Sequence, residues 1–212
     1  MGITASEVDK IKQAIPAPGV LPIIHQRWSA RAFADKDVPA DDLKRVFEAA
    51  RWAPSSFNEQ PWRYIVGTRG EGTRGMETHQ KIHESLVGFN QQWAGKAPVL
   101  ILGVAKTRFS RNDAPNSYAV YDLGAATAYM ALQAAALGLT THQMAGFDRE
   151  KARKLLAVPE GFEFGSVMAL GYQGEPQTLG NEELRKRETE PRQRKPLHEL
   201  VYASWGEPFP LG

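Results

Sequence analysis

Apolar residues recur at the spacing of helices and strands along most of the chain. Leu43, Val46, Phe47 and Ala50 fall on one face of a helix, and acidic residues begin their segment, where the helix dipole favours negative charge. The pattern therefore predicts an amphipathic helix over residues 41–50, directly before a loop rich in polar residues.

Four short runs of apolar and β-branched residues are typical of strands. They cover residues 63–67, 98–104, 140–144 and 164–172. The run at 98–104 is apolar almost throughout, so we expect that strand to be buried on both faces. Residues 164–172 are expected to form a final central strand.

Three further segments are predicted to be helical. One covers residues 4–14, begins with a Ser or Thr cap and ends at a breaker rich in Pro and Gly at 16–19. A second covers residues 78–93. A third follows Asp148, whose side chain is a candidate N-cap for the helix that contains Ala152.

Residues 118–139 form an almost continuous run of small and apolar residues. A transmembrane helix is the alternative, but Asp122 and Gln133 lie inside the run and alanine favours membrane insertion only weakly. We therefore expect a helix that packs in the core or against a second subunit.

Length and composition indicate a globular chain with a substantial core. The 212 residues are 42% hydrophobic, and we expect one domain over 1–212, with an N-terminal extension at 1–20 and a C-terminal arm at 181–212 that wraps over another surface. A formal charge of +2 gives no global attraction to nucleic acid or to a membrane.

The absence of cysteine excludes disulfides, thiolate catalysis and cysteine-based metal sites. His79 and His83 share one helix face, but no acidic partner completes a metal motif, so no metal is expected. The N-terminus does not have the pattern of a secretory signal. Together with the lack of cysteine, this favours a cytoplasmic location.

The first candidate site is an alternating polar segment. In an extended chain Arg27, Ser29 and Arg31 point the same way, so two guanidinium groups and a hydroxyl can converge on one anion such as a phosphate. Arg-x-Ser-x-Arg also occurs by chance, and the alternative is a solvated surface segment.

The second candidate is the loop 54–62, Pro-Ser-Ser-Phe-Asn-Glu-Gln-Pro-Trp. Its hydroxyl and amide groups can bind a ligand with several hydroxyls and carbonyls. The same residues also form ordinary turns, so either reading fits the loop alone.

Taken in order, these motifs resemble the nitroreductase-like family of flavin mononucleotide (FMN) oxidoreductases. That family begins with a basic-x-Ser-x-basic segment and continues to an Ala-Pro-Ser-Ser-x-Asn-x-Gln-Pro-Trp loop, as this chain does at 27–31 and 53–62. The resemblance continues through Ala-Leu-Gly-Leu at 136–139, Gly-Phe-Asp at 146–148, Ala-Leu-Gly-Tyr at 169–172 and the basic segment 192–197. It covers residues 22–201.

The resemblance implies a role for each candidate residue. Arg27 and Ser29, with Trp28 between them, would hold the FMN phosphate, and the pair Arg192 and Arg194 would close on it from the other end of the chain. Arg31 would lie nearer the flavin ring, where a cation stabilises the reduced anion. Other flavin contacts are implied for Ser55, Ser56 and Asn58 of the partner subunit, for Asn90, and for Gln143, Met144, Ala145 and Gly146.

Fold and activity are implied in the same way. The family has an α+β fold with a central, mostly antiparallel sheet flanked by helices, in an intertwined homodimer. NADH or NADPH would reduce FMN, and a nitroaromatic, quinone or activated alkene would reoxidise it in a ping-pong cycle. The flavin carries the chemistry, so no protein group is expected to act as the catalytic acid or base; Arg31 and the amides of Ala145 and Gly146 would tune the ring.

Two alternatives remain from the sequence. The same scaffold supports an oxygen-dependent enzyme that fragments FMN to dimethylbenzimidazole. A non-enzymatic reading takes the basic runs 185–187 and 192–195 as a tail for an acidic partner, although glutamates at 182, 183, 188 and 190 dilute it.

Overall fold

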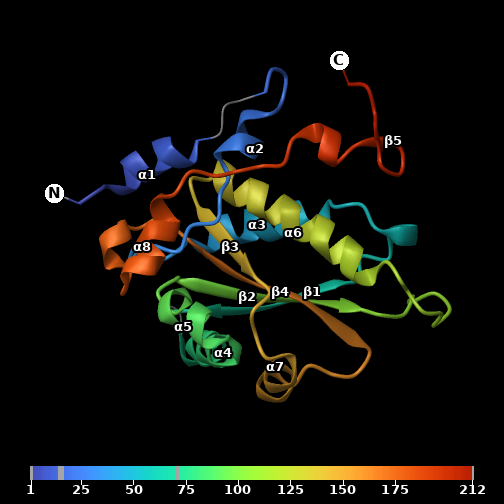
Figure 1. The fold of residues 1–212 in the computed structure, drawn as a ribbon. Coiled ribbons are helices and arrows are strands. Elements are labelled where there is room, and N and C mark those ends of the chain that lie inside the picture. Colours follow the sequence, from blue (N-terminus) through green and yellow to red (C-terminus); the bar gives the residue numbers. More distant parts are fainter. Residues whose placement is uncertain (1, 14–16, 70–71, 212) are drawn as a thin grey trace.

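The computed structural model describes residues 2–13, 17–69 and 72–211, and it is built on one antiparallel sheet (Figure 1). The strands are β1 (Trp62–Thr68), β2 (Val99–Lys106), β3 (Thr140–Met144) and β4 (Phe162–Gly171), in the order β1-β2-β4-β3. Each neighbouring pair is antiparallel. All four predicted strands are confirmed.

The central strand β2 is buried on both faces, as its apolar sequence predicts. Leu100, Leu102 and Val104 point into one core cluster, whereas Val99 and Ile101 point into the other. This alternation follows from the period of two along a strand, and it requires helices on both faces of the sheet.

Helices cover the two faces as separate layers. One face packs against α3 (Ala40–Arg51) and α6 (Ala119–Ala136), and the other packs against α4 (Gly72–Ser85) and α7 (Arg149–Leu156) (Figure 1). The predicted mixed α+β architecture with an antiparallel sheet and flanking helices is confirmed. Asp148 caps α7 as expected, because its Oδ1 accepts the Lys151 N–H at 2.9 Å.

The prediction of a single helix over 78–93 is wrong. The chain instead forms α4 and a separate α5 (Gly88–Ala94). Between them the backbone bonds to residues 146–148: the Val87 N–H donates to the Gly146 carbonyl at 3.1 Å, and the Ser85 carbonyl accepts the Asp148 N–H at 2.8 Å. Tertiary hydrogen bonds therefore replace the helix ladder at this point, and they fix the position of Gly146.

The N-terminal extension contains the predicted helix, α1 (Ala5–Lys12). A short α2 (Pro22–Gln26) follows the extension, and the sequence pattern does not predict it. Thr4 and Glu7 form a capping box at the start of α1, so the predicted Ser or Thr cap is confirmed. The expected end of this helix at 14 and the first residue of the 16–19 breaker lie outside the described residues.

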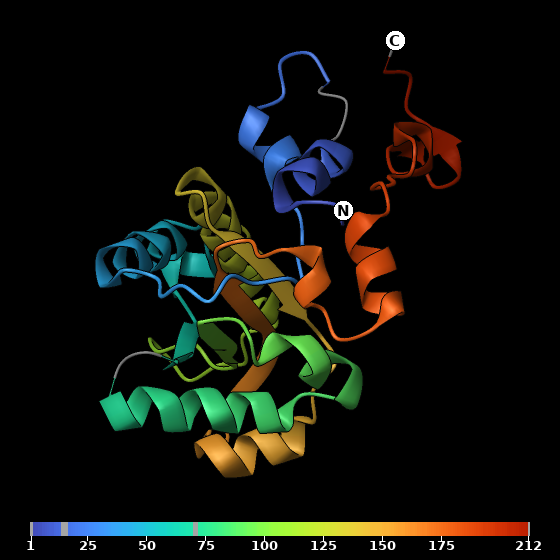
Figure 2. The ribbon, with the colours of Figure 1, turned by 90° about the vertical axis from the view of Figure 1, so that its left-hand side faces the viewer.

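The C-terminal part begins with a helix that the sequence pattern does not predict, because the segment is highly charged. Helix α8 (Glu182–Thr189) is capped by Asn181 and buries Leu184 and Glu188 one turn apart. Beyond it the chain forms the short hairpin β5 (Tyr202–Ser204) and β6 (Glu207–Pro208). In Figure 2 the part of the arm that follows α8, including this hairpin, lies away from the sheet. Trp205 in the hairpin is 95% exposed.

Three single turns of 3-10 helix complete the fold: η1 (Ser56–Asn58), η2 (Pro176–Thr178) and η3 (Leu197–Glu199). Helix α6 is buried along the side that faces the sheet, through Leu123, Ala126 and Met130. Its opposite side exposes Tyr121 and Tyr129. No helix among the described residues is both long and apolar enough to cross a bilayer.

Close approach of α4 to β1 generates a stability prediction. A Cβ at Gly67 would overlap the backbone N and Cα of His79, which cannot move without shifting the helix. Gly67→Ala should therefore destabilise the protein by about 1–3 kcal/mol in urea unfolding. Gly180→Ala is the control, because a Cβ there meets no atom within 4 Å. Equal stability of the two variants would contradict this packing.

Candidate functional site

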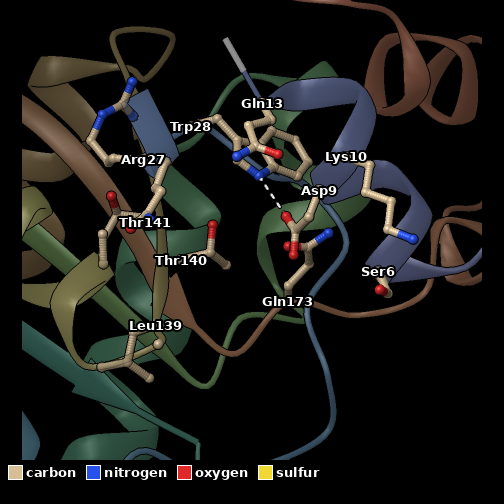
Figure 3. Close-up of a pocket in the computed structure, with 13 residues that line it drawn as sticks. Ser6, Asp9, Lys10, Gln13, Arg27, Trp28, Leu139, Thr140, Thr141 and Gln173 are labelled. Atoms are coloured by element: carbon tan, nitrogen blue, oxygen red, sulfur yellow. Dashed lines mark hydrogen bonds between the residues drawn. The ribbon is translucent and has the colours of Figure 1, made fainter. Parts of the chain in front are cut away.

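Residues 27–32, which we call the strap, carry the first candidate cluster. Exposure alternates along them: Trp28, Ala30 and Ala32 are buried, whereas Arg27, Ser29 and Arg31 are not. Figure 3 shows the Arg27 guanidinium directed away from the Trp28 indole. The predicted placement of the three polar side chains on one side of the strap agrees with this pattern.

Arginines from both ends of the chain gather beside the strap. Arg192 donates from Nη1 to the Arg27 carbonyl at 2.8 Å and from Nη2 to the His25 carbonyl. Arg194 is exposed. Burial is the largest cause that lowers the pKa of Arg192, and the charge of Arg194 lowers it further. Burial and then Arg194 also lower the pKa of Arg27.

Burial is the main cause of these pKa shifts, and the smaller contributions from Arg194 and Arg27 indicate that the three guanidinium groups are close enough to repel one another. None of the ion pairs found among the described residues includes Arg27, Arg192 or Arg194. A cluster of positive charge without an acidic partner is suited to an anionic ligand. Arg192 also supports the strap, because its hydrogen bonds hold the backbone on which Arg27 stands.

Arg31 lies further along the strap, and Glu188 holds its backbone. Its backbone N–H donates to both carboxylate oxygens of Glu188, at 2.9 and 3.0 Å. Its guanidinium lies 6.0 Å from the centre of the Trp93 ring, and its buried Nε has no hydrogen-bond partner within the described structure. A buried donor without a partner is costly, so it is available to a bound acceptor.

Residues 143–146 form the edge of the site next to the strap. The side chain of Met144 is buried in the core, so this residue can offer only its backbone. Gln143 is exposed and accepts the Ser166 hydroxyl at 3.1 Å. Within the described structure, the amides of Ala145 and Gly146 donate to no other protein group.

Asn90 fixes Gly146 from the other side. Its Nδ2 donates to the Gly146 carbonyl at 3.0 Å, which leaves its own carbonyl oxygen as an acceptor. A Cβ at Gly146 would come within 2.9 Å of Asn90 Nδ2 and 3.0 Å of Val87 Cγ2. A side chain therefore cannot be added at 146 without displacing Asn90 or Val87.

The second cluster lies in the loop that contains η1. The Ser56 N–H donates to Asp122 Oδ2 at 3.0 Å, and the Gln60 N–H donates to Ser55 Oγ at 3.0 Å. Phe57 and Asn58 have φ angles of 52° and 55°, which are uncommon for residues other than glycine. These bonds hold the loop in a strained shape that exposes Phe57 and Asn58.

The two clusters lie near opposite ends of α6. Asp122, which holds the loop, is in its first turn, whereas Ala135 in its last turn shares a cavity wall with Arg27. From Asp122 to Ala135 the helix rises about 20 Å. The strap and the loop of one chain therefore lie against opposite ends of α6.

A cavity of about 420 Å³ lies on the Trp28 side of the strap (Figure 3). It is bounded by α1, the turn after α6 and the start of β3, and the Trp28 indole N–H donates to Asp9 at 3.1 Å. It includes Arg27 and Trp28 but no other predicted site residue. Arg27 therefore borders the cavity, whereas Ser29 and Arg31 do not line it.

Histidine and aromatic side chains take mainly structural positions. His79 and His83 each bond a backbone carbonyl, at 2.9 and 3.0 Å, and no group of three or more potential metal ligands occurs among the described residues. Trp93 and Phe109 are buried, and Phe89 packs against the core, whereas Tyr118 and Tyr121 are exposed.

Two supporting residues are missed by sequence reasoning. In the sequence, Asp122 is used only as an argument against a membrane helix, but in the structure its carboxylate holds the loop through Ser56. Glu188 enters only as an acidic residue within a basic tail, yet it is fully buried under the strap. The four-residue spacing from Leu184 is the signal that places Glu188 on the buried face of a helix.

Comparisons with known proteins agree with the geometry. The sequence model described as "Nitroreductase family" matches residues 24–172. A solved structure described as an "oxidoreductase containing FMN" has a TM-score of 0.82 and 30% identity, and the match covers 91% of this chain and 95% of that one.

The chain also matches known proteins by sequence, of which we describe two. An Archaeoglobus fulgidus protein, provisionally named an NADH dehydrogenase/NAD(P)H nitroreductase, is 31% identical in an alignment of 156 residues that covers 72% of this chain and 84% of that protein. A Thermus thermophilus protein named NADH dehydrogenase is 27% identical in an alignment of 181 positions, gaps included, that covers 71% of this chain and 84% of that protein.

His142 generates a pH prediction. Its Nδ1 contacts the Ala30 carbonyl at 3.0 Å, and burial, with the nearby Arg31 charge, lowers its pKa to about 4. The unfolded chain then binds this proton more tightly, so the contribution of His142 to stability is complete above pH 6.5 and is lost as pH falls towards 4. The loss is on the order of 3 kcal/mol.

Urea unfolding of the protein without added ligand between pH 4 and 7 measures this effect. His142→Gln should flatten the dependence of the unfolding free energy on pH, whereas His198→Gln, on the exposed arm, should leave it unchanged. The same slope in His142→Gln and in the unsubstituted protein would contradict a buried, neutral His142.

Proposed function

Because the chain belongs to the Nitroreductase family, we propose that it is an FMN-dependent oxidoreductase that uses NADH or NADPH. Its acceptor is a nitroaromatic, a quinone or an activated alkene, and donor and acceptor use one site in turn. The gathering of Arg27, Arg192 and Arg194 beside the strap carries the proposal, since three cations without an acidic partner need an anion such as the FMN phosphate.

The residues present fit this cofactor at its phosphate end. Arg27 and Arg194 supply guanidinium donors, and Ser29 supplies a hydroxyl on the same side of the strap. Arg192 holds the strap by its backbone carbonyls and adds positive charge. Charge-assisted hydrogen bonds of this type contribute about 1.5–3 kcal/mol each.

Three groups are available to bind the ring of the cofactor, because they have no hydrogen-bond partner in the protein within the described residues. These are Nε of Arg31 and the backbone amides of Ala145 and Gly146. Asn90 presents its carbonyl oxygen beside them. Donors next to a cation suit the edge of an isoalloxazine ring that becomes more negative when reduced.

FMN, when bound, accepts a hydride from the nicotinamide and passes reducing equivalents to the acceptor. The protein side chains would bind the cofactor and orient it. None of the contacts described above forms an acid–base or nucleophile pair, and the donors at the ring edge are mostly backbone amides, which need no particular side chain.

We also propose that the site is completed by a second copy of the chain in a homodimer. Loop residues Ser55, Ser56 and Asn58 lie at the opposite end of α6 from the strap of their own chain, which supports a partner subunit bringing them to the ring. The exposed apolar residues of the arm are the surface expected of an intertwined interface: Leu197, Leu200, Tyr202, Trp205, Phe209 and Leu211.

An absorption spectrum of the purified protein tests the proposed function. We expect the spectrum of oxidised FMN, and we expect anaerobic NADH or NADPH to bleach it and a quinone or nitroaromatic to restore it. A flavin spectrum that neither nicotinamide bleaches would contradict an NAD(P)H oxidoreductase. Release of dimethylbenzimidazole in air would identify the FMN-fragmenting reaction instead.

Subunit complementation tests the divided site. Arg27→Ala damages the strap, and Asn58→Ala damages the loop, so each variant alone should lose most activity. If each site takes its strap from one subunit and its loop from the other, mixed dimers carry one intact site. Unfolding and refolding the two variants together should restore about a quarter of the sites.

Arg27→Ala mixed with Arg194→Ala is the matched control, since both residues lie on the same side of the divided site and mixed dimers then contain no intact site. Recovery of activity in this control, or no recovery in the Arg27→Ala and Asn58→Ala mixture, would contradict a loop contributed by the partner.

A further inference from the structure

Glu188 is a fully buried carboxylate beneath the strap. Its Oε1 accepts the N–H groups of Arg31 and Ala32, both at 2.9 Å, and its Oε2 accepts the Arg31 N–H at 3.0 Å. The strap lies more than 150 residues earlier in the chain, so these bonds fix two distant segments against each other. They determine where the Arg31 side chain begins.

Two cations face the Glu188 carboxylate. Lys12 of α1 is 6% exposed and donates to the backbone carbonyls of Arg187 and Glu190, at 3.0 and 2.5 Å, and Arg31 is the second cation. Burial raises the pKa of Glu188, whereas the backbone N–H groups, Arg31 and Lys12 oppose that rise.

The two cations differ in what else they bind. The Lys12 ammonium is already held by the C-terminal carbonyls of α8 and lies 5.0 Å from the centre of the Trp28 ring. Arg31 has no such partners within the described residues: its Nε is buried and unbonded, and its guanidinium lies 6.0 Å from the centre of the Trp93 ring. Arg31 is therefore the cation whose charge Glu188 can transmit to a ligand.

We propose that Glu188 is a positioning residue of the flavin site, which holds Arg31 at the ring and offsets part of its positive charge there. This inference rests on the proposed function. Arg31 alone would favour the negatively charged reduced flavin, and a carboxylate behind it weakens that preference. Glu188 thereby lowers the reduction potential of the bound cofactor.

The midpoint potential of bound FMN is the decisive readout. Glu188→Gln keeps an oxygen that can accept the Arg31 and Ala32 N–H groups but removes the charge. It should shift the potential to more positive values, so that reduced FMN gains about tenfold in affinity relative to oxidised FMN. Glu182→Gln is the control, with the same change on an exposed residue of α8, and it should leave the potential unchanged.

A double substitution separates this role from simple support of the fold. In an Arg31→Gln background, Glu188→Gln should shift the potential much less, because the cation that it acts on has gone. Glu188→Ala, which also removes the strap hydrogen bonds, should weaken the binding of oxidised FMN as well. Binding is followed by flavin fluorescence, so no readout depends on turnover.

Two results would overturn the inference alone: a wild-type potential in Glu188→Gln, or an equal shift with and without Arg31. A purely structural Glu188 would weaken oxidised and reduced FMN equally and leave the potential in place. If the unsubstituted protein binds no FMN, the proposed function fails and the inference fails with it.

Discussion

Mutual repulsion of three arginines is the constraint on which the site depends. Arg27, Arg192 and Arg194 come from opposite ends of the chain, and burial and then the charge of Arg194 lower the pKa of the other two. Like charges gathered in this way cost stability unless an anion lies between them. The hydrogen bonds of Arg192 to the strap show how the fold holds the cluster in place. An anion bound between the three guanidinium groups would offset this repulsion, which is why we propose the FMN phosphate for this position.

The rest of the fold supports this cluster from several directions. Glu188 fixes the strap from below, and the break between α4 and α5 fixes Gly146 beside Asn90. Asp122 holds the second cluster at the far end of α6. The same helix that packs on the sheet core thus keeps the two clusters at opposite ends, which is the observation behind the proposal of a site divided between two subunits.

Much of this arrangement can be predicted from the sequence. The strands and the helix 41–50 follow from periodicity, and the alternation of Arg27, Ser29 and Arg31 follows from extended backbone geometry. The break at Val87 could not be predicted, because it arises from hydrogen bonds to residues some 60 positions away. The spacing from Leu184 indicates that Glu188 is buried, but its hydrogen bonds to Arg31 and Ala32 join residues more than 150 positions apart. Its role therefore depends on a tertiary contact that the sequence pattern does not predict.

The central claim is that the arginine cluster binds the phosphate of FMN, and a comparison of FMN with riboflavin tests it most directly. Riboflavin has the same ring without the phosphate. The unsubstituted protein should bind FMN about a hundredfold more tightly than riboflavin, and the doubly substituted Arg27→Ala, Arg194→Ala protein should lose most of that difference while its riboflavin affinity changes little. Equal affinity for the two flavins in the unsubstituted protein, or an undiminished preference for FMN without both arginines, would contradict the account.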